Sequence, residues 1–126
     1  MSYYKICLWI STLGIEFLAL MPNGIKIVTN KLNATGAFEH VLAFGLLYIL
    51  LHLAYTHLGM MQKIVILFLF AIQLEAVQYF VPSRSVNIWD IVADMFGVGF
   101  IVVLWLGIRY FIRRKDNLST CRKEGV

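Results

Sequence analysis

The chain has 126 residues, of which 60% are hydrophobic and 14% are charged, and its mean hydropathy is +0.78. Soluble domains carry about 25% charged residues, so this composition excludes a soluble globular enzyme, a nucleic-acid-binding module and a disordered chain. The formal net charge of +4 lies entirely from Arg109 onward, where six basic residues face two acidic ones. Charge confined to one end indicates orientation in a membrane rather than a surface for nucleic acid.

Four apolar segments have the length of about 20 residues that a spanning helix needs. In chain order they cover about Tyr4–Met21, Ala37–His57, Lys63–Phe80 and Ile88–Ile112. Helix breakers separate them, namely Pro22 and Gly24, then Gly59, then Pro82. The sequence predicts an all-α, four-helix transmembrane bundle, with a membrane domain over residues 1–112 and a basic cytoplasmic tail over 113–126.

The first segment is expected to be an uncleaved span rather than a signal peptide, because Glu16 interrupts its apolar run. Four spans place both termini on one side. If that side is the cytoplasm, eight basic residues lie inside and only Lys26, Lys31 and Arg84 lie outside. This positive-inside bias predicts a multi-pass protein of the cell membrane with both termini cytoplasmic.

Polar residues of the predicted spans collect at the outer end under this topology. The carboxylates there are Glu16, Glu39, Glu75, Asp90 and Asp94. Charged groups in spans usually face the bundle interior, pair with one another and mark function. Glu75 and Gln78 are three residues apart and Asp90 and Asp94 are four apart, so each pair shares one face of its helix.

Arg84 lies in the short connection between the third and fourth spans, within reach of either acidic pair. A guanidinium binds a carboxylate or a phosphate through two parallel hydrogen bonds. The candidate ligand-binding cluster is therefore His40, Glu75, Gln78, Arg84, Asp90 and Asp94. A structural alternative stands beside it, because Asn87-Ile88-Trp89-Asp90 also resembles a helix-capping box and Glu39 has the position of a residue that meets a helix dipole.

Four motifs in fixed order resemble the VanZ-like family of small membrane proteins. They are His40–Phe44, Glu75–Gln78 (Glu-x-x-Gln), Pro82–Ser85 (Pro-x-Arg) and Asp90–Gly97, and together they cover about Ala37 to Gly99. Two positions depart from the family pattern. Gly36-Ala37 stands where Asp-Lys is common, and Asp94 replaces a common Asn. The missing lysine leaves the site more acidic and weakens an anion-binding role carried over from the family.

The resemblance implies a cell-envelope protein, since the founding member of the family is associated with teicoplanin resistance at the cell surface. We expect the cluster to bind, or to change the presentation of, a lipid-linked or surface cell-wall component such as a polyprenyl-phosphate-linked ligand, with membrane lipids as partners and no nucleic acid. One alternative is a membrane-embedded enzyme that uses the cluster for acid–base chemistry or for a divalent metal. Another is a purely structural cluster that locks the helices together. The sequence assigns no catalytic residue, and no cofactor is expected outside the metal alternative.

Overall fold

The computed structural model describes residues 2–20, 35–81 and 87–124. Four helices account for nearly all of them and no strand occurs in these ranges: α1 (Tyr3–Leu20), α2 (Thr35–Ala54), α3 (Met60–Gln78) and α4 (Ile88–Glu124). Each helix contains a stretch long and apolar enough to cross a membrane. The prediction of an all-α fold with four membrane-competent helices is confirmed.

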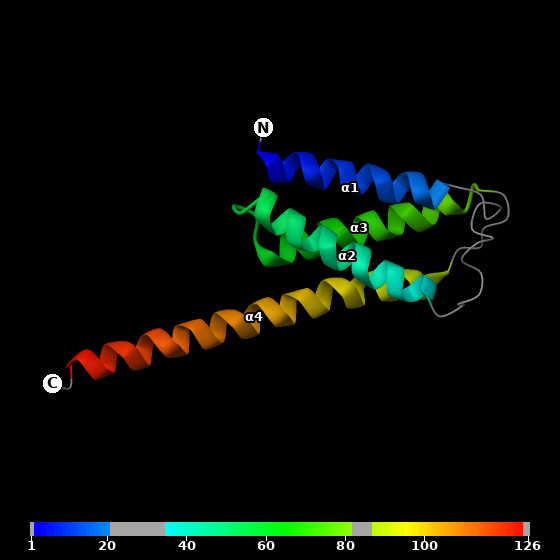
Figure 1. Cartoon of the computed structure of the whole chain (residues 1–126). Helices are drawn as coiled ribbons and strands as arrows, with labels where there is room; N and C mark the ends of the chain where they lie inside the picture. The colour runs from blue at the N-terminus through cyan, green and yellow to red at the C-terminus, as the bar shows by residue number, and fades with distance from the viewer. Residues whose placement is uncertain (1, 21–34, 82–86, 125–126) are drawn as a thin grey trace.

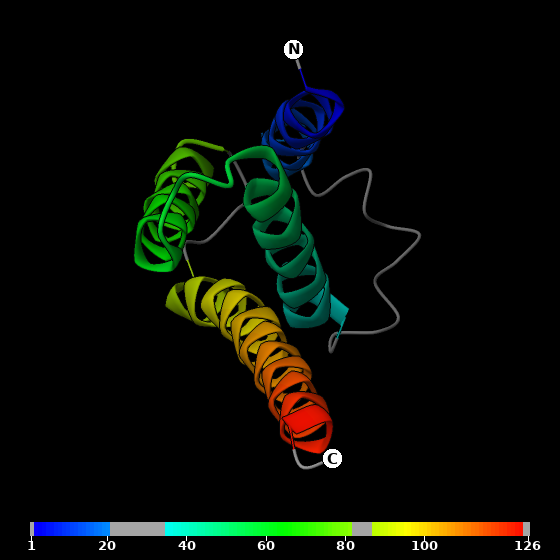
Figure 2. The ribbon, with the colours of Figure 1, turned by 90° about the vertical axis from the view of Figure 1, so that its left-hand side faces the viewer.

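The helices alternate in direction, so that α1 and α3 run one way and α2 and α4 run the other (Figure 1). Viewed from the end of the bundle, α2 lies at the centre with the other three helices around it (Figure 2). It packs against all three, and its interface with α4 is the most extensive in the molecule. The arrangement gives the bundle two chemically different ends.

We name the first of these the polar end, where α1 finishes at Leu20, α2 begins at Thr35, α3 finishes at Gln78 and α4 begins at Ile88. The opposite end, formed by the α2–α3 turn and the neighbouring part of α4, is the basic end. The cytoplasmic position of both termini stays a prediction from the distribution of basic residues.

The ends of α2 and α4 differ from the predicted spans, and the other helix ends agree with the prediction to within three residues. α2 finishes at Ala54 rather than at His57, because a turn at Tyr55 leads into α3 and the Gly59 amide donates a hydrogen bond of 2.8 Å to the Gln62 side chain. This contact fixes the first turn of α3. α4 passes residue 112 without a break, so the predicted basic tail begins as a continuation of that helix.

The core between the helices is apolar, with Phe44, Leu47, Leu67, Ala71 and Val98 buried. Large apolar side chains also cover the outside of the bundle, as expected for a surface that contacts lipid.

Small residues bring α2 and α4 close together. A Cβ atom at Gly97 would overlap the carbonyl oxygen of Val41 and would lie 2.9 Å from its carbonyl carbon, and a Cβ at Gly45 would lie 3.5 Å from the carbonyl oxygen of Gly97. The absence of a side chain at Gly97 therefore sets the distance between the two helices.

Candidate functional site

The polar end holds the five carboxylates of the predicted cluster and its surroundings, because each lies near the end of a helix that terminates there. Glu16 is the outlying member. Its Oε1 accepts a hydrogen bond of 2.6 Å from Gln73 Nε2, which ties α1 to α3 on an exposed face. The remaining polar side chains form the site itself.

His40 and Asp94 form the centre of the site and join α2 to α4. The Nδ1 atom of His40 lies 2.9 Å from Oδ1 of Asp94, and only 1% of the surface of Asp94 is exposed. An ionised Asp94 carboxylate accepts from Nδ1–H and so selects the tautomer or the charged form of the ring. The geometry orients the imidazole and leaves Nε2 as its second functional atom.

Asp90 lies one helical turn before Asp94 and faces the other ring nitrogen. Its Oδ2 is 3.9 Å from Nε2 of His40, a distance too long for a direct hydrogen bond but close enough for electrostatic attraction. Its Oδ1 accepts 2.9 Å from the Asn87 side-chain amide, whose oxygen accepts from the backbone N–H of Trp89. Asp90 thus takes part both in the cap of α4 and in the surroundings of His40.

Glu75 connects α3 to the start of α4. Its residue is buried, and Oε2 accepts a hydrogen bond of 3.0 Å from the backbone N–H of Asn87. The carboxylate therefore fixes the position of the residue directly before α4, the helix that contains Asp90 and Asp94. This contact supports a positioning role for Glu75.

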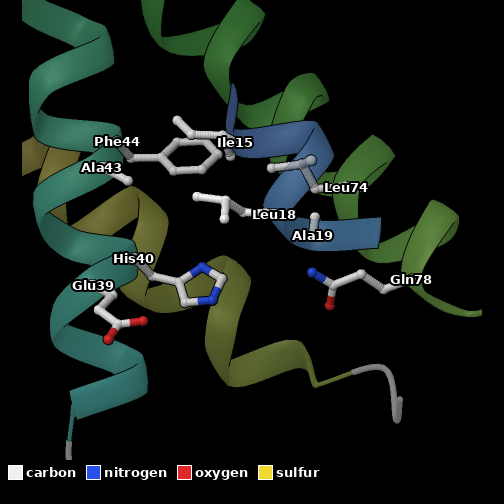
Figure 3. Close-up of a pocket in the computed structure, with 9 residues that line it drawn as sticks. All are labelled: Ile15, Leu18, Ala19, Glu39, His40, Ala43, Phe44, Leu74 and Gln78. Carbon is white, nitrogen blue, oxygen red and sulfur yellow. The ribbon is translucent and has the colours of Figure 1, made fainter. Parts of the chain in front are cut away.

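Gln78 lies at the end of α3 with only 4% of its surface exposed. Its amide points toward the His40 ring across a pocket of about 130 Å³, which Figure 3 shows. The structure gives this amide no hydrogen bond to any residue in the ranges that it describes. Buried amides are almost always paired, so the pocket presents an unused donor and acceptor beside the imidazole.

The rest of the pocket wall comes from three helices and is mostly apolar. It consists of Ile15, Leu18 and Ala19 from α1, Glu39, Ala43 and Phe44 from α2, and Leu74 from α3. A second cavity, of about 300 Å³, follows along the same three helices toward the basic end. Its lining is Leu8, Trp9, Thr12, Leu47, Leu51, Tyr55, Leu58, Ile66, Leu67 and Phe70. The hydroxyl of Thr12 donates to the Leu8 carbonyl at 2.8 Å, so this cavity offers an apolar surface.

The structure thus brings together five of the six predicted site residues. The sixth, Arg84, lies outside the described residues, as do Pro82, Ser83 and Ser85 of the same motif. Its predicted contact with an acidic pair or with a phosphate stays a prediction from the sequence.

Sequence reasoning missed two parts of the site. The sequence indicates Asn87 only as a helix cap, and its three-residue spacing to Asp90 is the signal for their side-chain contact. Its backbone contact with Glu75 has no such signal. The contribution of Ile15, Leu18 and Ala19 carried no signal, because apolar residues in an apolar helix do not indicate which neighbour they contact.

The metal alternative needs several ligands at one point. Within the described residues, no group of three or more His, Cys, Asp or Glu side chains is placed to hold a metal ion. The pairs His40–Asp94 and His40–Asp90 instead form a hydrogen bond and a longer electrostatic contact.

Four membrane-competent helices, closed at one end by a polar cluster, define a small multi-pass helical membrane protein. The family model described as VanZ/LLP1 matches residues 6–112, and the chain therefore belongs to this family. The match confirms the resemblance found in the four sequence motifs and extends it to α1. Comparison with curated proteins and with solved structures gives no match.

Proposed function

We propose that this VanZ/LLP1 protein binds a lipid-linked component of the cell envelope and changes its presentation at the membrane surface. The polar head of the ligand occupies the pocket between His40 and Gln78, and its hydrocarbon chain follows the apolar cavity along α1, α2 and α3. The order of the two cavities supports this proposal, since an amphiphile needs a polar and an apolar compartment in succession.

The buried Gln78 amide carries the proposal. A polar group removed from solvent without a partner costs about 1–3 kcal/mol, and this amide points into a pocket toward an imidazole that Asp94 already orients. A ligand that supplies hydroxyl or amide groups satisfies both side chains at once. Lipid-linked sugars and peptides carry such groups.

The charge around the pocket favours a neutral hydrogen-bonding head at this position. Asp90 and Asp94 lie against the single imidazole and Glu39 lines the pocket, so a phosphate placed here meets more negative than positive charge. The phosphate of a polyprenyl-phosphate-linked ligand therefore needs a further cation, and Arg84 is the sequence-based candidate for that role. An effect on glycopeptide susceptibility would follow from sequestering or reorienting such a ligand.

Mass spectrometry of lipids that co-purify with the protein tests the proposal. We expect wild type to retain a lipid-linked sugar or peptide, and Gln78→Leu to retain about tenfold less, which matches the loss of a buried hydrogen bond. Gln73→Leu is the matched control, since it makes the same change on the same helix at an exposed position outside the pocket. It also removes the hydrogen bond to Glu16, so it shows how much lipid is lost when only the α1–α3 contact is weakened. Arg84→Ala tests the predicted phosphate contact. Equal lipid content in wild type and Gln78→Leu would refute binding at this pocket.

The His40–Asp94 pair also supports a second candidate function, acid–base catalysis on the bound head group. A buried carboxylate that fixes Nδ1 leaves Nε2 of His40 to accept or donate a proton. If this candidate is right, Asp94→Asn, which leaves His40 and Gln78 in the pocket, should retain the ligand but stop its conversion in a reconstituted assay. Unchanged ligand after incubation with wild type would leave binding as the function.

A further inference from the structure

A buried cation lies at the basic end, far from the site just described. Lys63 is in the first turn of α3 and is only 2% exposed. All five carboxylates whose side chains the structure describes lie at the polar end, so Lys63 has no described acidic partner. Its hydrogen-bonding partner in the described structure is the Nδ1 atom of His52, at 3.3 Å. A buried charge without a counter-ion is costly and calls for one.

The direction of this hydrogen bond determines what His52 presents to its surroundings. An ammonium group only donates, so Nδ1 accepts and the ring proton lies on Nε2. The ring stacks on Tyr48 at 6.2 Å between centroids and meets the edge of Trp105 at 4.9 Å. These aromatic rings, with Ile49, Leu53 and Ile101, line a cavity of about 100 Å³. Lys63 thus polarises the His52 imidazole, and the Nε2–H of this ring is the hydrogen-bond donor of a pocket that is otherwise apolar.

Further positive charge acts on the same imidazole. Arg109 lies one helical turn beyond Trp105, whose ring meets that of His52, and the N-terminus of α3, beside Lys63, adds the positive end of its dipole. Lys5 also lies at this end, but its ammonium is 5.0 Å from the centre of the Tyr55 ring and it is not a member of the proposed site. Lys63, Arg109 and the N-terminus of α3 together attract an anion.

The depth of the pocket identifies the source of that anion. Arg109 is 21 residues from the start of α4, which is about 31 Å along a helix and matches the hydrocarbon thickness of a bilayer. His52 lies in the last turn of α2. Both side chains therefore stand at the level where lipid head groups begin, and the apolar walls of the pocket fit the adjoining chain.

We propose that the basic end binds the phosphodiester of an anionic membrane lipid. Its oxygens accept from His52 Nε2–H and from the Arg109 guanidinium, while Lys63 supplies the buried charge that polarises the imidazole. Basic pockets between transmembrane helices bind lipid phosphates in this way. The site is separate from the polar end and does not depend on the function proposed there.

Lipid selection from defined mixtures tests this site. Purified protein is equilibrated with mixed micelles of phosphatidylglycerol and phosphatidylcholine, and bound lipid is counted by native mass spectrometry. We expect the lipid bound to wild type to be enriched in phosphatidylglycerol. In Lys63→Met this enrichment should be about fivefold lower, which is the equivalent of about 1 kcal/mol for one basic residue. Lys5→Met is the matched control, because it removes the same charge at the same end without touching His52, and it should keep the enrichment.

Arg109→Gln provides an independent readout, because the Arg109 side chain is exposed and its loss does not disturb the core. It should lower the enrichment by a similar factor even if Lys63→Met does not fold. Two results would overturn the proposal. One is an equal loss in Lys5→Met and Arg109→Gln, which would indicate only a diffuse charge effect. The other is displacement of the lipid by inorganic phosphate at equal concentration, which would indicate a soluble anion instead.

Discussion

Replacing Gly97 by alanine should separate α2 from α4 and break the site at the same time. A new Cβ would lie 2.9 Å from the carbonyl carbon of Val41 and would overlap its oxygen. Carbon atoms pack at about 3.5–4.0 Å, so the helices must move apart by about 0.6–1.1 Å. Backbone atoms form this contact, and no side-chain rotation relieves it. Overpacking of this kind costs about 1–3 kcal/mol.

The same displacement reaches the functional site. His40 precedes Val41 on α2, and Asp94 lies one turn before Gly97 on α4, so a separation there lengthens their contact of 2.9 Å to about 3.5–4.0 Å. That distance is beyond a hydrogen bond. Loss of a hydrogen bond to a charged group adds about 1.5–3 kcal/mol, which brings the expected destabilisation to about 2.5–6 kcal/mol.

Gly99→Ala is the matched control, because a Cβ at Gly99 meets nothing within 4 Å on the same helix. Alanine is the better helix former by about 1 kcal/mol, so this variant should be as stable as wild type or more so. The free energy of unfolding is measured by titration with sodium dodecyl sulfate in mild detergent micelles. Equal stability of Gly97→Ala and Gly99→Ala would refute the close approach of α2 and α4.

Two further predictions concern the polar cluster. Asp94→Asn should destabilise the protein by about 2 kcal/mol, because Asp94 is buried and its carboxylate lies 2.9 Å from the His40 ring. Asp90→Asn should cost less than about 1 kcal/mol, because its carboxylate lies 3.9 Å from the same ring. The same unfolding titration compares the two variants, and a larger effect at Asp90 would contradict the assigned roles. Glu75→Gln should lower stability by about 1 kcal/mol by weakening the bond from the Asn87 N–H, yet leave the co-purifying lipid unchanged. A loss of lipid in Glu75→Gln would instead place this side chain in contact with the ligand.

Most of the fold could be predicted from the sequence, because the length of an apolar segment determines whether it can span a bilayer. The end of α2 was harder to place. Tyr55 and His57 continue the apolar and aromatic pattern, and the turn that replaces them depends on the Gly59–Gln62 contact. The sequence does not predict that α4 continues beyond Ile112, because the basic segment that follows has no periodic pattern of apolar residues to indicate a helix.

Spacing predicted which polar residues share a helical face but not which residues meet across helices. Asp90 and Asp94 were placed together from their four-residue separation, whereas the bond from Asp94 to His40 joins positions 54 residues apart. That bond depends on α2 lying beside α4, and the close contact at Gly97 allows the two helices to approach. A glycine in an apolar run does not reveal its partner.

The length of α4 has a mechanical consequence. Its 37 residues form one helix of about 55 Å, so about 25 Å lies beyond the thickness of a hydrocarbon core. Figure 1 shows this part extending past the other helices. The chain has only two prolines, and neither is in α4, so the helix has no proline hinge where it leaves the bundle. Because the helix is continuous over this length, a small tilt of α4 at the polar end would move the end near Glu124 through a larger distance.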